Sequence, residues 1–230
     1  MAKILNIDTS SSICSVALSI DLETVVGLES ASKMDHSTSL APFISKALNY
    51  LRERGEMLDA VSVIFGPGSY TGLRIGLSMA KGIAYGLNIP LITISSLEVM
   101  AVRAIFTYPE FSGTEIVVPM IDARRMEVFT AAYDSALRLK MPECAMILDE
   151  NSYHELQKES KVLFIGNGTE KFFNLYGCDN AIWLGEGMAH AKYMPVISEK
   201  YYRENRFADI AYSVPNYLKE YQTTKPKNNI

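Results

Sequence analysis

The sequence predicts an α/β protein in which a mixed five-stranded sheet is covered by helices and is followed by a second, smaller lobe. Apolar runs between residues 3 and 94 indicate the strands, and apolar residues spaced three or four apart indicate the helices. The elements follow the order β-β-β-α-β-α-β-α. Strands joined by short turns pair antiparallel, whereas strands joined through a helix pair parallel. We expect residues 1–107 to form the first lobe and residues 108–230 the second.

Each strand of the first lobe is predicted by a continuous apolar run or by a period of two. The segment KILNID is nearly all apolar, as expected for a strand in the centre of a sheet. In the next strand Cys14, Val16 and Leu18 alternate with small residues, which indicates one buried face. The expected strands are Lys3–Asp8, Ile13–Ile20, Thr24–Glu29, Ala60–Phe65 and Leu91–Ile94.

Three helices are expected between and after these strands. The first is capped by Ser37 or Thr38 and is stopped by Gly55. The second extends from Gly72 to Leu87, and the third begins near Ser96. The apolar stripe of the first helix consists of Leu40, Ile44, Ala47, Leu48 and Leu51.

The second lobe gives weaker signals. Glu115–Ile121 and Met126–Tyr133 read as two strands joined in a hairpin. A further strand is expected at Val162–Ile165. Helices are expected near Ser152–Glu159, Thr169–Tyr176 and 189–203.

No grouping of side chains predicts a catalytic centre. Histidines occur only at positions 36, 154 and 190, so HxxxH and HExxH are absent, and there is no GxSxG motif. Asp122 and Glu127 could form an acid–base pair, but a hairpin turn salt-bridged to Arg124 and Arg125 is favoured. We therefore predict no catalytic residues and no metal ligands.

Two loops could hold a phosphate group. In the first, an acid and three hydroxyls follow the first strand, and in the second, glycines separate a strand from a helix N-terminus. Tight turns held by local hydrogen bonds explain the same residues, so both readings stay open. The candidate nucleotide-binding residues are Asp8, Thr9, Ser10, Gly66 and Gly68.

The helix between Gly72 and Leu87 has nearly two apolar faces, although a helix on a sheet needs only one. Its small residues Gly72, Gly76, Ala80 and Ala84 recur every four positions, which would let another helix approach closely. Either the second lobe or another protein covers the extra face, and a protein partner is favoured. The expected interface residues are Leu40, Ile44, Leu48, Gly72, Ile75, Gly76, Met79, Ala80 and Ile83.

The composition is that of an ordinary globular protein, with 48% hydrophobic and 21% charged residues in 230. A net charge of −4 gives the isolated chain no electrostatic reason to bind nucleic acid. Three scattered cysteines exclude a disulfide framework and a CxxC metal site. The longest uncharged run, Gly82–Leu97, is too short to span a bilayer, so we expect a cytoplasmic protein without a membrane partner.

Five short segments carry the most specific signal. They are IDTS at 7–10, His36-Ser37, GPGSYTGLRIG at 66–76, DARRMEVF at 122–129 and PNYL at 215–218. Together they resemble the TsaB (YeaZ) family, and the resemblance extends from residue 4 to about residue 219. Thr38 departs from the family pattern where an acid is common, and Lys219 departs where arginine is frequent.

The resemblance implies a two-lobed actin/Hsp70/sugar-kinase-like (ribonuclease H-like) fold, in agreement with the strand order. It implies a non-catalytic scaffold or activator subunit in bacterial synthesis of N6-threonylcarbamoyladenosine beside the tRNA anticodon. The implied partners are TsaD, bound through the two N-terminal helices, and the ATPase TsaE, with a homodimer when alone and tRNA only within the complex. No intrinsic cofactor is implied, while ATP or ADP and Mg²⁺ enter at the level of the complex.

Two other functions stay open. A nucleotide-dependent phosphotransferase of the same superfamily would need a second phosphate loop, and Gly166-Asn167-Gly168-Thr169 is the one candidate, although it lacks an acid. A peptidase would need a metal pair or an activated nucleophile, and neither is visible.

Overall fold

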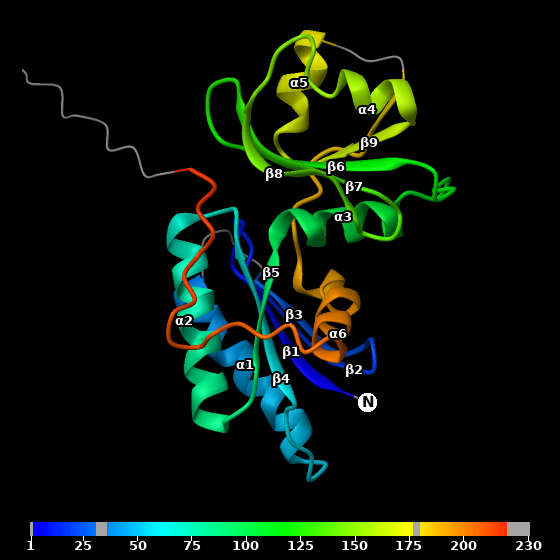
Figure 1. Ribbon diagram of the computed structural model, residues 1–230. Coiled ribbons are helices and arrows are strands. Elements are labelled where there is room, and N and C mark those ends of the chain that lie inside the picture. The colour runs from blue at the N-terminus through cyan, green and yellow to red at the C-terminus, as the bar shows by residue number, and fades with distance from the viewer. Residues whose placement is uncertain (1, 31–35, 177–179, 220–230) are drawn as a thin grey trace, which may run out of the picture.

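The computed structural model describes residues 2–30, 36–176 and 180–219, which form two lobes stacked end to end (Figure 1). Each lobe contains a five-stranded sheet, with strand orders β3-β2-β1-β4-β5 and β10-β9-β6-β7-β8. The predicted mixed five-stranded sheet of the first lobe is confirmed. Among the described residues, no helix has the length and apolar character needed to cross a membrane.

In the first sheet, the earliest strand lies in the middle. Strand β1 pairs antiparallel with β2, which pairs antiparallel with β3, while β1, β4 and β5 run parallel. This arrangement follows from the connections, because short turns join the first three strands and helices precede the last two. The strands are β1 (Lys3–Asp8), β2 (Ser15–Ile20), β3 (Glu23–Glu29), β4 (Ala60–Gly66) and β5 (Leu91–Ser95).

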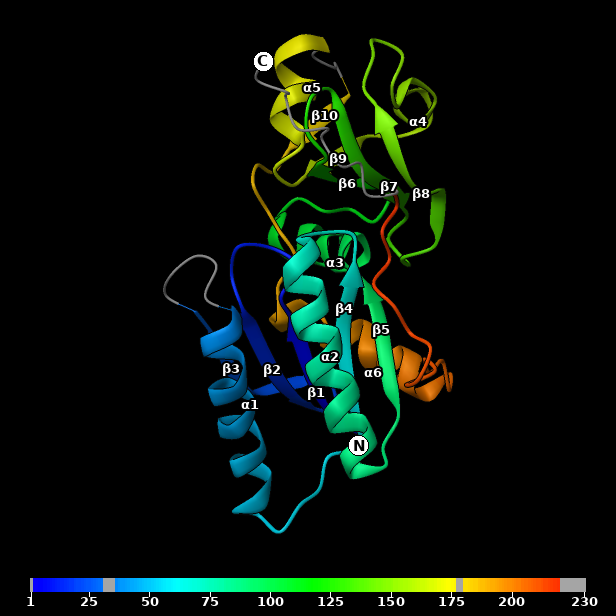
Figure 2. The same cartoon turned by 90° about the vertical axis from the view of Figure 1, so that its left-hand side faces the viewer.

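Helices α1 (His36–Arg52) and α2 (Tyr70–Leu87) lie side by side on one face of this sheet, as Figure 2 shows. The apolar stripe predicted for α1 faces inward, with Leu40 and Leu51 buried against the sheet. Helix α2 begins two residues earlier than expected because the Ser69 hydroxyl accepts a hydrogen bond from the Gly72 N–H and caps it.

The other face of the first sheet is covered by α3 (Ser96–Thr107), a short 3₁₀ turn (Ala191–Tyr193) and α6 (Pro195–Arg203). Helix α3 also packs on the second sheet, so it lies between the lobes (Figure 1). The chain that follows the second lobe thus returns to the first, where the Ala191 N–H donates a hydrogen bond to the Ser15 hydroxyl. The division at residue 107 stays a prediction, but residues 191–203 lie on the first sheet rather than on the second.

The second sheet repeats the topology of the first. Its earliest strand, β6, is again central: β6 pairs antiparallel with β7, which pairs antiparallel with β8, while β6, β9 and β10 run parallel. Helices α4 (His154–Glu159) and α5 (Thr169–Tyr176) belong to this lobe, and Phe164 and Phe172 lie in its core. The strands are β6 (Ile116–Asp122), β7 (Glu127–Tyr133), β8 (Leu139–Ile147), β9 (Val162–Ile165) and β10 (Ala181–Trp183).

Strands β8 and β10 were not expected from the sequence, in which the second lobe gives weaker signals than the first. Strand β8 contains Pro142, which argues against a central strand but is tolerated at the sheet edge where β8 lies. Strand β10 has only three residues, too few for a periodic signal.

The last described residues, 208–219, form a C-terminal strap along the first lobe. Ala208 pairs with Leu91 of β5, and the Lys81 ammonium of α2 donates to the carbonyls of Ala211 and Ser213. Further on, the Asn216 N–H donates to the carbonyl of Phe65, at 2.7 Å. The strap therefore crosses β5, α2 and the end of β4 in turn.

The end of the strap joins the two lobes. Tyr217 stacks on Tyr70 with ring centroids 5.0 Å apart, and its hydroxyl accepts a hydrogen bond from Arg74. Two residues later, the Lys219 ammonium pairs with the Glu127 carboxylate of the second lobe. The strap thus fixes one lobe to the other through contacts far apart in the sequence.

Candidate functional site

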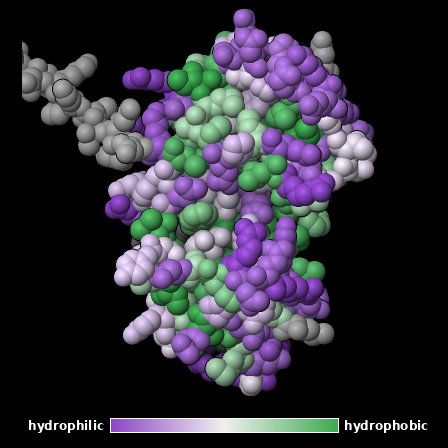
Figure 3. Space-filling model, viewed as in Figure 1, coloured by the Kyte–Doolittle hydropathy of each residue, from purple (hydrophilic) through white to green (hydrophobic). Residues whose placement is uncertain are grey.

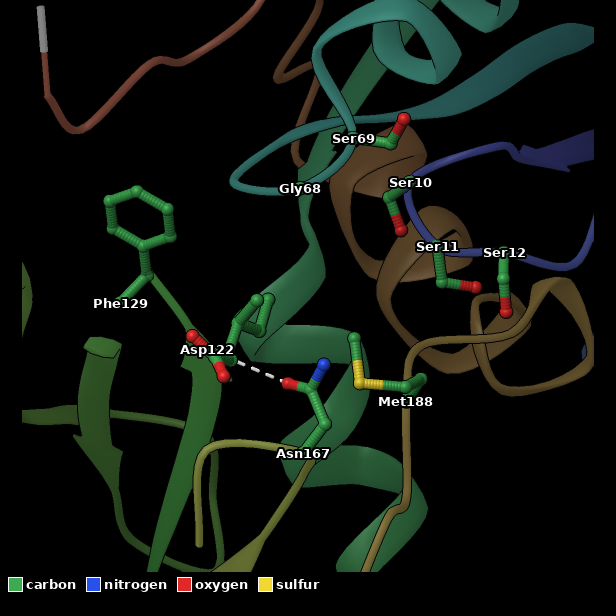
Figure 4. A pocket seen from close by; sticks show the side chains of 10 residues that line it. Ser10, Ser11, Ser12, Gly68, Ser69, Asp122, Phe129, Asn167 and Met188 are labelled. Atoms are coloured by element: carbon green, nitrogen blue, oxygen red, sulfur yellow. Dashed lines mark hydrogen bonds between the residues drawn. The ribbon is translucent and has the colours of Figure 1, made fainter. Parts of the chain in front are cut away.

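A pocket of about 360 Å³ lies between the lobes (Figure 4). The first lobe contributes the loop after β1 and the loop before α2, and the second lobe contributes the ends of β6 and β9 and part of β7. Hydroxyl groups line one wall, whereas an acid, an amide and apolar side chains line the other. The lining residues are Ser10, Ser11, Ser12, Gly68, Ser69, Ile121, Asp122, Phe129, Asn167 and Met188.

Of the predicted nucleotide-binding residues, only Ser10 and Gly68 line this pocket. Asp8 and Thr9 are buried, and Gly66 packs against the C-terminal strap. The positions of Phe129 and Met188 in the pocket wall were not predicted, because apolar lining residues resemble core residues in any pattern of hydrophobicity.

The glycines of the loop before α2 are required by the chain's own backbone. A Cβ atom on Gly66 would collide with the Asn216 carbonyl, and one on Gly68 would collide with the Ser10 carbonyl. A Cβ on Gly72 would likewise collide with the backbone of Thr9, whose hydroxyl donates to the Gly72 carbonyl at 2.7 Å. The close approach that glycine permits is therefore used for packing between loops.

The glycine-containing loop after β9, residues 166–169, is also held by hydrogen bonds within its own lobe. The Gly168 N–H donates to the Met120 carbonyl at 3.0 Å, and the Thr169 hydroxyl donates to the Gly166 carbonyl at 2.8 Å. The Asn167 side-chain oxygen accepts a hydrogen bond from the Asp122 N–H. Only the Asn167 side chain of this loop reaches the pocket.

Asp8 ends β1 inside the protein. One carboxylate oxygen accepts hydrogen bonds from the Ser10 N–H at 2.8 Å and from the Ser10 hydroxyl at 2.7 Å. The other oxygen has no hydrogen-bond partner among the described residues. Burial raises the pKa of Asp8 above its ordinary value, although the hydrogen bonds from Ser10 oppose the rise.

Asp8→Asn is expected to stabilise the protein at neutral pH. The raised pKa means that folded Asp8 keeps its proton to higher pH than unfolded Asp8, so stability is lost as the pH rises above 3.8 toward the folded pKa. Asparagine can accept both hydrogen bonds from Ser10 and carries no charge. Thermal melting of both proteins between about pH 4 and 8 should show a growing advantage for the variant. A difference that does not change with pH would contradict this expectation.

The acids around the hairpin between β6 and β7 pair differently from the expectation. Asp122 pairs with Lys171 at 2.8 Å, and Glu127 pairs with Lys219. Arg124 and Arg125 occupy the turn with positive φ and form no ion pair with any described residue. The expected salt bridges within the hairpin are therefore wrong, because Lys171 of α5 and Lys219 of the strap form ion pairs with these two acids instead.

Hydrogen bonding also sets the charge of Asp122, which lies at the pocket. Partial burial raises its pKa, but hydrogen bonds from Lys171 and from the Arg124 N–H outweigh this and hold the pKa below its ordinary value. The pocket therefore presents a carboxylate at its second-lobe wall. Within the described ranges, no three His, Cys, Asp or Glu side chains are grouped so that they could hold a metal ion.

The predicted row of small residues on α2 faces the sheet, which corrects part of the expected interface. Gly72, Gly76, Ala80 and Ala84 are all buried. A Cβ on Gly76 would collide with the Thr9 hydroxyl. Two further expected interface residues, Leu40 and Ile44, are buried beneath α1. These residues cannot contact a partner because the first sheet already covers them.

The opposite side of α2 is open. Gly82 and Gly86 have no atom within 4 Å of where a Cβ would lie, and Tyr85 is 81% exposed. Ser78, Gly82 and Gly86 form a second row of small residues at four-residue spacing. This row was not predicted as an interface, because the sequence analysis assigned that role to the row that is buried. The remaining expected interface residues are half-buried, and they are Ile75, Met79 and Ile83 of α2 and Leu48 of α1.

Comparisons with known proteins point to one process. The family model described as TsaD, tRNA N6-adenosine threonylcarbamoyltransferase, matches residues 29–229. The chain is 32% identical over 225 residues to the tRNA threonylcarbamoyladenosine biosynthesis protein TsaB of Bacillus subtilis (strain 168), covering 94% of this chain and 93% of that protein. It is 29% identical over 224 residues to the protein of the same name from Escherichia coli (strain K12), covering 94% of each.

The fold is also found among solved structures. YeaZ from Pseudomonas aeruginosa superposes with a TM-score of 0.76 at 24% identity, covering 95% of this chain and 100% of that one. A second structure, described as an uncharacterized protein with similarity to peptidase YEAZ from the same organism, gives a TM-score of 0.78 at 24% identity, with the same coverage. At this level of identity the likeness establishes the fold.

Proposed function

The chain belongs to the TsaB (YeaZ) family, and on that premise we propose that it is a non-catalytic subunit that binds TsaD in tRNA threonylcarbamoyladenosine biosynthesis. Relatives that match most of its length are named as biosynthesis proteins for this modification. The proposal assigns the chemistry to TsaD and gives this chain the role of a scaffold or activator.

The main support for the non-catalytic role is that the protein's own residues occupy the space beside the glycines of both loops. A phosphate loop needs free backbone N–H groups that converge on an open space. Here Asn216, Ser10 and Thr9 fill the places that the glycines leave, and the loop after β9 is held by Met120 and its own Thr169. A phosphotransferase or peptidase of this architecture would need groups that these loops do not supply.

The binding role rests on the outer side of α1 and α2. Half-buried apolar side chains, two open glycines and an exposed tyrosine lie together on one helix, α2. Packed helices have their axes about 8–10 Å apart, and small side chains at the contact give the shorter separations. Gly82 and Gly86 would therefore let a partner helix pack closely on α2. We propose TsaD as the principal partner. TsaE, tRNA and ATP or ADP with Mg²⁺ join only in the assembled complex.

Reconstitution tests this function. TsaD, TsaE, tRNA, ATP and a threonylcarbamoyl-AMP donor, which TsaC-type enzymes make, are combined with and without this chain, and threonylcarbamoyladenosine is measured by mass spectrometry after tRNA digestion. We expect formation of the modified base to depend on the chain and to follow its binding to TsaD. Equal product in its absence would contradict the proposed function.

The isolated chain is expected to show no ATP hydrolysis, sugar phosphorylation or peptide cleavage above the buffer control. The first two reactions need an open phosphate loop, which neither described lobe has, and peptide cleavage needs a metal site or an activated nucleophile, for which the described residues show no grouping. The measurement is release of phosphate or of a fluorescent peptide product by the purified chain. Turnover that persists through purification and disappears in Asp8→Ala would show that the chain is itself an enzyme.

A further inference from the structure

The hairpin between β6 and β7 has an unusual residue pair at its turn. Arg124 and Arg125 have φ values of 71° and 50°. Both values lie in the left-handed region, where a Cβ atom is crowded and glycine or asparagine is favoured. A turn with two such positions is typically occupied by Asn-Gly. Unfavourable backbone of this kind is found at functional sites, and here it directs attention to the arginine side chains.

Both guanidinium groups are available to a ligand. Arg124 and Arg125 are exposed and form no ion pair with any described residue. The next arginine of the second lobe, Arg138, instead pairs with Asp134 at 2.8 Å. Two adjacent positive charges thus remain without a counter-charge of their own in the described part of the chain.

The base of the hairpin is held firmly. Lys171 donates to the Asp122 carboxylate at 2.8 Å and to the Glu127 carbonyl at 3.1 Å, and Lys219 pairs with the Glu127 carboxylate. The Arg124 N–H also donates to the Asp122 carboxylate, at 2.6 Å. The two arginines are therefore presented from an ordered base, which lowers the entropy lost when a ligand binds.

The charge of this hairpin differs from that of the lobe around it. Figure 3 shows many hydrophilic side chains on the second lobe, which is the upper lobe in this view. Residues 108–190 carry 13 acidic and seven basic side chains, so the charge of this segment is negative. At the hairpin, four basic residues face two acids, Asp122 and Glu127. We call these four the hairpin cluster: Arg124, Arg125, Lys171 and Lys219.

We infer that the hairpin cluster binds the phosphate backbone of tRNA in the assembled complex, with Arg124 and Arg125 as the phosphate ligands. The inference rests on the proposed function, which makes tRNA a component of that complex. A guanidinium group is planar and permanently charged, and its donors match the oxygens of a phosphate. Contacts to phosphates position a nucleic acid and supply much of its affinity.

The cluster alone is too small to retain tRNA. Two guanidinium groups offer two phosphate contacts on a chain whose net charge is −4, so tight binding needs TsaD as a second surface. The hairpin cluster and the TsaD surface proposed on α1 and α2 share no residue. One subunit can therefore contact both components of the complex through different residues.

The test measures binding of a fluorescently labelled tRNA transcript to the complex of this chain with full-length TsaD, by anisotropy. Salt is varied between about 50 and 200 mM. Arg124→Asn/Arg125→Gly replaces both arginines with residues that the turn favours, so its Tm should not fall. We expect the Kd for tRNA to rise about tenfold or more at low salt. The slope of log K against log salt should fall by about two, one for each lost phosphate contact.

Two further variants separate the effect of the cluster from that of net charge. Arg124→Lys/Arg125→Lys keeps both positive charges and should keep most of the affinity and of the salt dependence. Lys158→Gln/Lys161→Gln removes two charges from exposed positions elsewhere on the second lobe. This control should bind tRNA as the unsubstituted complex does.

The possible outcomes are distinct. An unchanged Kd and salt slope for Arg124→Asn/Arg125→Gly would overturn the inference and leave the proposed function intact. An equal loss in Lys158→Gln/Lys161→Gln would also overturn it, because affinity would then depend on net charge alone. Calorimetry with TsaD and with TsaE examines an acidic protein as the ligand, and weaker binding of either protein by Arg124→Asn/Arg125→Gly would contradict the inference. If the unsubstituted chain does not bind TsaD, the proposed function fails, and the inference fails with it.

Discussion

Gly76→Leu is expected to leave little or no folded protein. Gly76 lies on the side of α2 that faces the sheet, where even a Cβ would collide with the Thr9 hydroxyl and lie 3.5 Å from Val63. Overpacking a core costs typically 1–3 kcal/mol, and lifting α2 from the sheet would also expose apolar area worth about 25 cal/mol per Å². We expect the melting temperature to fall by about 10 °C or more, or the variant to be insoluble, since 1 kcal/mol shifts Tm by about 2–4 °C in a chain of this size. Circular dichroism with thermal melting provides the measurement.

Gly82→Leu is the matched control, because it places the same side chain on the same helix. Gly82 has open space around it, and leucine favours a helix over glycine by roughly 0.8 kcal/mol. Its Tm should therefore equal or slightly exceed that of the unsubstituted chain. If both variants melt alike, the orientation of α2 described here is wrong.

Gly82→Leu is also expected to abolish binding to TsaD while the chain stays folded. A leucine there would prevent a helix from packing closely on the open row Ser78, Gly82 and Gly86, so that the apolar side chains around it lose their contact area. We expect the Kd to rise about a hundredfold or more, with an equivalent loss of threonylcarbamoyladenosine in the reconstituted reaction. The measurements are calorimetric titration with TsaD and quantification of the modified base.

Glu159→Leu serves as the control for this loss, because it adds the same side chain at the end of α4 in the second lobe. It should bind TsaD as the unsubstituted chain does. Normal TsaD binding by folded Gly82→Leu would show that the interface lies elsewhere.

The first sheet could be predicted because its strands and helices differ in period. Apolar residues alternate in β2 and recur at every third or fourth position in α1, and each pattern indicates one buried face. The order of strands and helices then determines which strands run parallel. The second sheet was only partly predictable. Strand β8 carries a proline and a mixed pattern that an edge position tolerates, and no local pattern shows that an edge exists.

The orientation of α2 could not be predicted for a different reason. The helix carries two rows of small residues on opposite sides, and small residues suit close contact with a sheet as well as with a helix. What selects the inner row is Thr9, whose contact with Gly72 and Gly76 joins segments more than 60 residues apart. The pocket was equally hidden, because its walls come from both lobes and meet only in the folded chain.

The C-terminal strap has a consequence for synthesis on the ribosome. The space beside Gly66 is filled by Asn216, and Tyr70 stacks on Tyr217, so the end of β4 and the start of α2 contact residues that are synthesised about 150 positions later. During vectorial synthesis the first sheet also lacks α6, which covers its second face, until the second lobe has left the exit tunnel. A chain truncated before residue 216 would therefore lack the contacts that cover Gly66 and Tyr70. Segments from near both ends of the described chain therefore pack in one lobe, and we expect that lobe to complete its packing only after residue 217 has been synthesised.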